Sequence, residues 1–185
     1  MKILVLGASG MLGNAMLRVM SEKEGWSIFG TVRGAYPALH AAAPRAVLIS
    51  GVHADQPDSL LAAFAQARPD VVINCVGLVK QLSSAEDPLV AVPINTLLPH
   101  RLARMCEVAG ARLVHVSTDC VFSGKQGNYT ESNLADARDV YGRSKLLGEV
   151  DYPHAVTLRT SIIGHELRSA HGLIDWFLSQ QARVK

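Results

Sequence analysis

The sequence lacks the features of a membrane protein and of a nucleic-acid-binding protein. It has no apolar run near the ~20 residues that a membrane-spanning helix needs, and no run of consecutive Lys or Arg. The formal net charge is only +2, which indicates no attraction to nucleic acid. Three glycines break the apolar stretch near the amino terminus, unlike the core of a signal peptide. We therefore expect neither a membrane nor a nucleic-acid partner.

Cysteine is also scarce. Cys75, Cys106 and Cys120 lie far apart without a C-x-x-C motif, which argues against a disulfide framework and a zinc site. The closest pair of histidines, His165 and His171, lacks the spacing of a known metal motif. We interpret them as solvent-exposed loop residues. These absences predict a cytoplasmic protein without a metal site.

Short apolar runs alternate in this chain with segments of helical periodicity. The chain has 185 residues, of which 49% are hydrophobic. This is enough to form the hydrophobic core of one domain, or of one domain and part of another. The alternation predicts an α/β fold, a doubly wound parallel sheet of the Rossmann type. We expect a loop over residues 36–44. We expect strands over residues 3–6, 26–32, 46–49, 71–76, 112–117 and 155–158, and helices beginning near residues 11 and 58 and over residues 93–108, 139–149 and 173–180.

A glycine-rich turn joins the first strand to the first helix. Gly7, Gly10 and Gly13 have the spacing G-x-x-G-x-x-G. We expect Gly7 to make the turn, Gly10 to admit a pyrophosphate and Gly13 to let the helix pack on the strand. The N–H groups at the start of the helix would face the phosphates; the alternative is an ordinary glycine-rich loop. The predicted cofactor contacts in this turn are Gly7, Ser9, Gly10, Met11, Leu12 and Gly13.

The end of the second strand bears on the choice of cofactor. No Asp or Glu occurs between Gly25 and His53, whereas Arg33 directly follows the strand. In a dinucleotide fold, an acidic residue there suits the ribose 2′-hydroxyl of NAD, and an arginine suits the 2′-phosphate of NADP. A solvent-exposed loop arginine is the alternative interpretation. We expect NADP(H) to be preferred and NAD(H) to be possible.

Ligands of such sheets lie at the carboxyl ends of the strands. The strand over residues 71–76 therefore places Cys75, Val76 and Gly77 beside the cofactor, and Lys80 and Gln81 near the cofactor or the substrate.

The helix expected over residues 93–108 contains Pro99. The proline removes the hydrogen bond to the carbonyl of Asn95. A structural kink is one explanation, and a held water that feeds a proton path is the other.

The glycine turn, the Ser-Thr pair at the end of the fifth strand and a Tyr-Lys pair after it together indicate an oxidoreductase. Tyr141 and Lys145 are four residues apart and share a helix face, and Ser117 and Thr118 end the fifth strand. Together with the glycine turn, Tyr141-x-x-x-Lys145 resembles the extended short-chain dehydrogenase/reductase family. The stretch Ser117-Thr118-Asp119-x-Val121-Phe122-x-Gly124 is similar to its dTDP-4-dehydrorhamnose reductase branch, and the resemblance runs over essentially the whole chain.

The predicted catalytic residues are Thr118, Tyr141 and Lys145. Reduction of a ketone leaves negative charge on its oxygen, which Tyr141 would protonate while the Thr118 hydroxyl donates a hydrogen bond. We expect Lys145, and any positively charged nicotinamide, to lower the pKa of Tyr141. The resemblance further implies that Lys145 holds the nicotinamide ribose, and Ser117 is also expected to contact the cofactor.

Cys120 stands where the reductase branch often has Tyr, and where sugar-nucleotide 4,6-dehydratases have a catalytic Glu. We interpret Cys120 as pocket lining, because no histidine base lies nearby in sequence. This departure argues against a dehydratase and leaves the identity of the sugar open.

The resemblance implies a smaller substrate domain that is largely absent from this chain. We expect residues 1–164 to form the dinucleotide-binding domain and residues 165–185 to begin the substrate domain, in either a fragment or a trimmed relative. The predicted function is NADPH-dependent reduction of a 4-keto-6-deoxy sugar nucleotide. The alternatives are an NAD-dependent sugar-nucleotide epimerase and a non-catalytic nucleotide-binding relative. A homodimer through the helices over residues 93–108 and 141–149 is implied by the resemblance.

Overall fold

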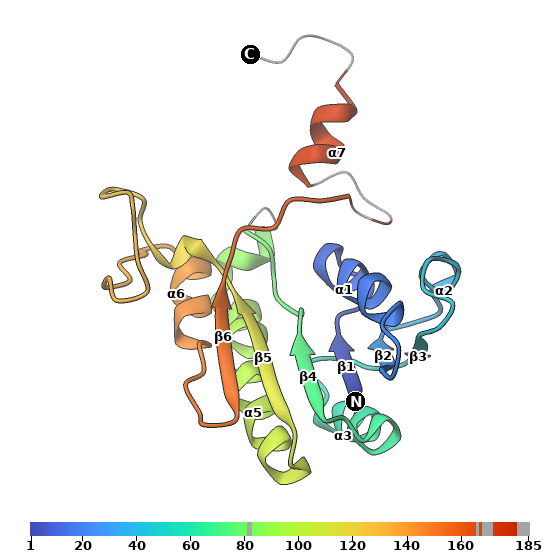
Figure 1. Cartoon of the computed structure of the whole chain (residues 1–185). Coiled ribbons are helices and arrows are strands. Elements are labelled where there is room, and N and C mark those ends of the chain that lie inside the picture. Colours follow the sequence, from blue (N-terminus) through green and yellow to red (C-terminus); the bar gives the residue numbers. More distant parts are fainter. Residues whose placement is uncertain (81–82, 166, 168–171, 181–185) are drawn as a thin grey trace.

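A parallel sheet forms the centre of the computed structural model, which describes residues 1–80, 83–165, 167 and 172–180, without the side chains of Ser83 and Leu173. Within these residues the sheet has six strands in the order β3-β2-β1-β4-β5-β6, whose arrowheads point to the same edge (Figure 1). This order confirms the predicted doubly wound fold. The strands are β1 (Lys2–Leu6), β2 (Ser27–Thr31), β3 (Val47–Ile49), β4 (Val71–Asn74), β5 (Arg112–Ser117) and β6 (Ala155–Arg159).

Helices cover both faces of the sheet. The longer ones are α1 (Met11–Ser21), α3 (Pro57–Ala67), α5 (Leu98–Ala109) and α6 (Val140–Leu147). The shorter ones are α2 (Pro37–Ala42), η1 (Ser83–Glu86), α4 (Pro88–Ala91), the π-helical η2 (Val92–Leu97), η3 (Asp119–Val121) and α7 (Leu173–Leu178).

Strand β1 has no polar alternation because both of its faces are buried. Ile3 and Val5 pack with α1 and α2 in one core cluster. Leu4 and Leu6 pack with α3 and α5 in the other. All four side chains are almost fully buried, as expected for a central parallel strand.

Two predicted elements differ from the structure. The loop expected over residues 36–44 contains α2, because Pro37 occupies the first turn, where its missing N–H costs nothing, and Leu39 is fully buried. The helix expected over residues 93–108 is divided between η2 and α5, and Pro99 lies in the first turn of α5. The predicted interruption is thus a change from π- to α-helical hydrogen bonding, in which the Leu98 N–H bonds to the Pro93 carbonyl.

The bounds of β5 are those predicted, residues 112–117, and the bounds of the other predicted helices and strands differ from the predictions by a few residues. The predicted domain boundary after residue 164 stays a prediction, and Gln81 and His171 lie outside the described residues. None of the helices in the described part of the chain has the length and apolarity that a membrane crossing requires. In that part there is also no group of three or more metal-binding side chains that could hold an ion.

Candidate active site

The glycine turn has the close packing that its spacing predicts. Gly7 has a φ of +76°, and a Cβ there would lie 3.0 Å from Cγ2 of Val76. A Cβ on Gly13 would overlap the carbonyl oxygen of Gly7. Gly7 therefore makes the turn, and Gly13 lets α1 approach the end of β1.

The start of α1 is open to an anion. Gly10 is the N-cap and offers no side-chain hydrogen bond, and the first turn carries no acidic residue. The turn is held from β2 by Thr31, whose hydroxyl accepts from the Gly7 N–H at 3.2 Å and whose carbonyl accepts from the Ala8 N–H at 3.0 Å. Sequence reasoning missed Thr31, although a threonine near the end of the strand expected over residues 26–32 is a signal for it. These groups fit a pyrophosphate.

A cavity of about 280 Å³ lies at the carboxyl ends of β4, β5 and β6. It adjoins α1 through Leu12 and α6 through Tyr141 and Lys145. Of the predicted site residues, those lining it are Leu12, Cys75, Val76, Gly77, Lys80, Ser117, Thr118, Cys120, Tyr141 and Lys145. The predicted contacts outside its lining are Gly7, Ser9, Gly10, Met11, Gly13 and Arg33. Most of these outside residues form the turn where a phosphate would bind. The cavity therefore suits the nicotinamide end of an extended dinucleotide, and the turn suits its pyrophosphate.

Lys145 is almost fully buried, and its ammonium group donates to the Val116 carbonyl at 2.8 Å. Burial lowers the pKa of Lys145 to about 8, although the nearby Glu149 carboxylate acts in the opposite direction. Lys145 also borders Gly77, where a Cβ would lie 3.6 Å from the Nζ atom. The site thus holds a cation close to the backbone of the β4 turn.

Tyr141 is half-buried at the start of α6. Burial raises the pKa of its phenol, and a hydrogen bond with Thr118 opposes this effect. The lowering expected from Lys145 and a nicotinamide is not found in the protein alone: the net shift is upward because burial dominates, and the Lys145 ammonium bonds to a carbonyl of β5. The phenol is therefore protonated at neutral pH, which is the form that can donate a proton.

Thr118 lies between these groups and the end of β5. Its hydroxyl oxygen accepts from the Cys120 N–H at 3.1 Å, and the hydroxyl donates to Asp119 at 3.3 Å. Asp119 also accepts from Ser161 at 2.7 Å, and this bond is the main cause of its lowered pKa. Asp119 and Ser161, which sequence reasoning missed, both line the cavity.

Three other predicted residues have specific surroundings. The Ser117 hydroxyl donates to Glu149 at 2.8 Å, so it is occupied by the protein itself. Burial raises the pKa of Cys75 to about 12, which keeps its thiol neutral. Arg33 is exposed, and no carboxylate within the described residues forms an ion pair with it.

Asn95 is buried where η2 meets α6. Its side chain accepts from the Leu78 N–H at 3.0 Å and donates to Ser144 at 3.2 Å. Its backbone carbonyl lies against Gly148, where a Cβ would overlap the oxygen. Asn95 therefore connects the loop after β4 to the helix that carries Tyr141 and Lys145.

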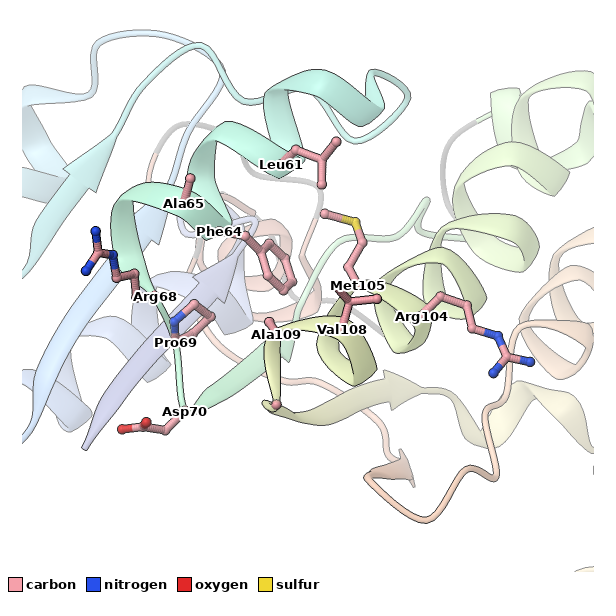
Figure 2. A pocket seen from close by; sticks show the side chains of 11 residues that line it. Leu61, Phe64, Ala65, Arg68, Pro69, Asp70, Arg104, Met105, Val108 and Ala109 are labelled. Atoms are coloured by element: carbon pink, nitrogen blue, oxygen red, sulfur yellow. The ribbon is translucent and has the colours of Figure 1, made fainter.

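Two other cavities differ in chemistry. One of about 710 Å³ lies between α3 and α5, where Leu61 and Phe64 face Met105 and Val108 (Figure 2). Its lining is mainly apolar and contains none of the predicted site residues, so we do not assign it to catalysis. The other, of about 500 Å³, shares Lys80, Asp119 and Cys120 with the candidate site and is bordered by Arg159.

Comparison with known proteins gives concordant results. Residues 1–173 match the family model described as RmlD substrate binding domain. The chain is similar to a dTDP-4-dehydrorhamnose reductase of Mycobacterium tuberculosis, with 28% identity over 94% of this chain and 58% of that protein. It is also similar to methionine adenosyltransferase 2 subunit beta of Xenopus tropicalis, with 28% identity over 88% of this chain and 47% of that protein.

Among solved structures, a hypothetical dTDP-4-dehydrorhamnose reductase of Sulfolobus tokodaii is similar, with a TM-score of 0.70 and 28% identity over 86% of this chain and 55% of that one. The chain thus spans about half the length of the proteins it matches.

Proposed function

Because the chain belongs to the RmlD substrate binding domain family, we propose that it carries the active site of an NADPH-dependent reductase of a 4-keto-6-deoxy sugar nucleotide. One observation supports this most: Thr118, Tyr141 and Lys145 line a single cavity. The similar reductase of M. tuberculosis supports the substrate class.

The residues present fit a dinucleotide. The turn at Gly7 and Gly13 leaves no room for a Cβ, and the uncapped start of α1 would hold the pyrophosphate. Arg33, exposed at the end of β2, would hold the 2′-phosphate of NADP. The chemistry that a bound nicotinamide supplies is hydride transfer to the carbonyl carbon.

Tyr141 is the proposed proton donor. The ketone oxygen gains negative charge during reduction, and the Tyr141 phenol, which is protonated at neutral pH, would supply the proton for it. Thr118 would donate a second hydrogen bond to this oxygen, exchanging its long 3.3 Å bond to Asp119 for a stronger one. Lys145, with a pKa of about 8, is mainly protonated at neutral pH and would stabilise the phenolate that remains.

Replacement of the Tyr141 hydroxyl tests this assignment. In the natural full-length protein, Tyr141→Phe should lower kcat by about 10²–10⁴-fold, the usual contribution of a general acid. NADPH affinity should change little. The measurement is NADPH oxidation with a dTDP-4-keto-6-deoxy sugar, followed by absorbance. Tyr152→Phe, which removes a hydroxyl bonded to His100, is the matched control. A Tyr141→Phe enzyme with most of its activity would contradict the proposal.

A second candidate is a non-catalytic nucleotide-binding subunit, favoured by the similarity to the X. tropicalis subunit beta. It predicts that the full-length protein binds NADPH without turnover. A sugar-nucleotide epimerase would instead convert its substrate with no net consumption of NADPH. The absorbance assay therefore identifies the reductase, and chromatography of the sugar nucleotide after incubation distinguishes the epimerase from the non-catalytic subunit.

We further propose a cytoplasmic homodimer. The described cysteines, Cys75, Cys106 and Cys120, are all unpaired, as is usual in a reducing compartment. Leu97 beside α5 and Leu147 at the end of α6 are exposed, which supports a contact between copies through these helices.

A further inference from the structure

The Glu149 carboxylate lies just beyond α6 and joins three elements. Its Oε1 atom accepts from the Ser117 hydroxyl at 2.8 Å and from Nε of Arg159 at 2.9 Å. Its Oε2 atom accepts from Nη2 of Arg159 at 2.7 Å. The side chains of Glu149 and Arg159 are only 15% and 25% exposed, so this bidentate pair is shielded from water.

Each partner of Glu149 adjoins the candidate active site. Ser117 precedes Thr118 at the end of β5 and pairs in register with Arg159 of β6. Arg159 precedes Thr160 and Ser161, which line the cavity. A single carboxylate therefore connects α6, β5 and β6 at the edge where the reaction would occur.

Arg159 extends this connection to the loop after η3. Its guanidinium lies 5.1 Å from the centre of the Phe122 ring. Phe122 in turn stacks on Tyr129, with ring centres 4.4 Å apart. Both rings border the 500 Å³ cavity that adjoins the candidate site, so Glu149 also supports the wall of the neighbouring cavity.

Glu149 acts on Lys145 through its charge as well. It lies one helical turn beyond Lys145 and raises the pKa of that lysine, against the effect of burial. Of the other groups around Lys145, the Tyr141 phenol on α6 is neutral, and burial lowers the pKa of His115 on β5 to about 3, so it is neutral as well. Lys80 and Asp119 line the same cavity, but the charge that shifts the pKa of Lys145 is that of Glu149. Glu149 is therefore the charged partner that favours the ammonium form.

We propose that Glu149 is a positioning residue, which holds Thr118, Tyr141 and Lys145 in their mutual arrangement through its bonds to Ser117 and Arg159 and through its charge, one helical turn from the Lys145 ammonium. This inference rests on the proposed reductase function. It assigns Glu149 no contact with substrate or cofactor.

Glu149→Gln tests the inference, because it preserves the shape of the side chain but removes its charge. In the full-length protein we expect kcat to fall about tenfold, since small misplacements of reacting groups are costly. The KM for NADPH should stay within about twofold, because the turn at Gly7 and the Arg33 side chain, which would hold the phosphates, make no contact with Glu149. The matched control is Glu107→Gln, which removes an exposed carboxylate bonded to Arg104 and should leave kcat unchanged.

A second measurement does not need turnover. The pH dependence of Lys145 acetylation, followed by peptide mass spectrometry, reports the protonation of this amine in each variant. Loss of the carboxylate should move the midpoint of this dependence about one pH unit lower, because an opposite charge has been removed. The alkaline limb of kcat should move in the same direction.

The two measurements separate the possible failures. If the wild-type protein binds NADPH but reduces no sugar nucleotide, the proposed function fails, and Lys145 acetylation alone decides the role of Glu149. An unchanged acetylation midpoint would overturn the inference, even with reduced kcat, because it indicates a merely structural role. If Glu149→Gln does not fold, Ser117→Ala removes one of the three bonds, and kcat equal to wild type would then overturn it.

Discussion

At the residue scale, small differences in shape decide what the glycine turn can bind. Gly7 is required by its positive φ and Gly13 by the backbone of Gly7, whereas a Cβ on Gly10 would lie 3.4 Å from the Gly7 carbonyl, an ordinary contact. The suitability of the turn for a phosphate therefore depends on its open N–H groups as well as on its missing side chains.

Arg33 allows a direct test of the proposed cofactor. Arg33→Ala should weaken NADPH binding about tenfold, as expected for the loss of a charged phosphate contact. NADH binding should be unchanged, because NADH lacks the 2′-phosphate. Fluorescence titration with both cofactors measures the effect, and Arg45→Ala, another exposed arginine, is the control. Equal losses for both cofactors would refute a specific role of Arg33.

At the element scale, the contact between η2 and α6 positions the catalytic helix. Asn95 bonds to Ser144 through its side chain, Thr96 bonds to the Ser144 carbonyl at 2.8 Å, and Gly148 packs against the Asn95 carbonyl. Asn95 and Thr96 of the π-helical η2 thus contact α6 and its end at Ser144 and Gly148. The placement of Tyr141 and Lys145 therefore depends on η2 as well as on α6 itself.

Gly148→Ala should reduce the free energy of unfolding by about 2–4 kcal/mol, because the new Cβ meets backbone that no rotamer change can clear. Urea denaturation measures this change. The control is Gly34→Ala, where a Cβ would meet no atom within 4 Å. A Gly148→Ala protein as stable as the control would show that η2 and α6 can separate without cost.

At the scale of the whole molecule, the candidate site and the apolar cavity lie in different places and differ in chemistry. The polar candidate site lies at the carboxyl ends of the strands, and the apolar 710 Å³ cavity lies between α3 and α5 (Figure 2). Exposed apolar side chains also occur on different faces, with Leu61 on α3 and Leu147 on α6. Substitutions on these faces can therefore locate a contact between copies.

Leu147→Glu should convert the proposed homodimer into a monomer, since a buried unpaired carboxylate is unfavourable in an apolar contact. Sedimentation equilibrium of the full-length protein measures the mass. Leu61→Glu, an equivalent change on α3, should leave the dimer intact. A dimer that persists in Leu147→Glu but dissociates in Leu61→Glu would place the contact on the α3 face instead.

The sequence alone determined the parallel sheet, the glycine turn and the shared helix face of Tyr141 and Lys145. These follow from local rules: apolar runs without alternation for buried strands, the chirality of crossovers, and the four-residue spacing of a helix. The family resemblance, confirmed over residues 1–173, rests on the same local motifs.

Only the tertiary structure decided how these groups interact. Lys145 bonds to Val116, 29 residues away, and Ser117 bonds to Glu149, 32 residues away. Burial among such partners raises the pKa of Tyr141, against the expectation from its neighbour Lys145. Desolvation and long-range hydrogen bonds depend on which elements pack together, and periodicity along the chain carries no information about that packing.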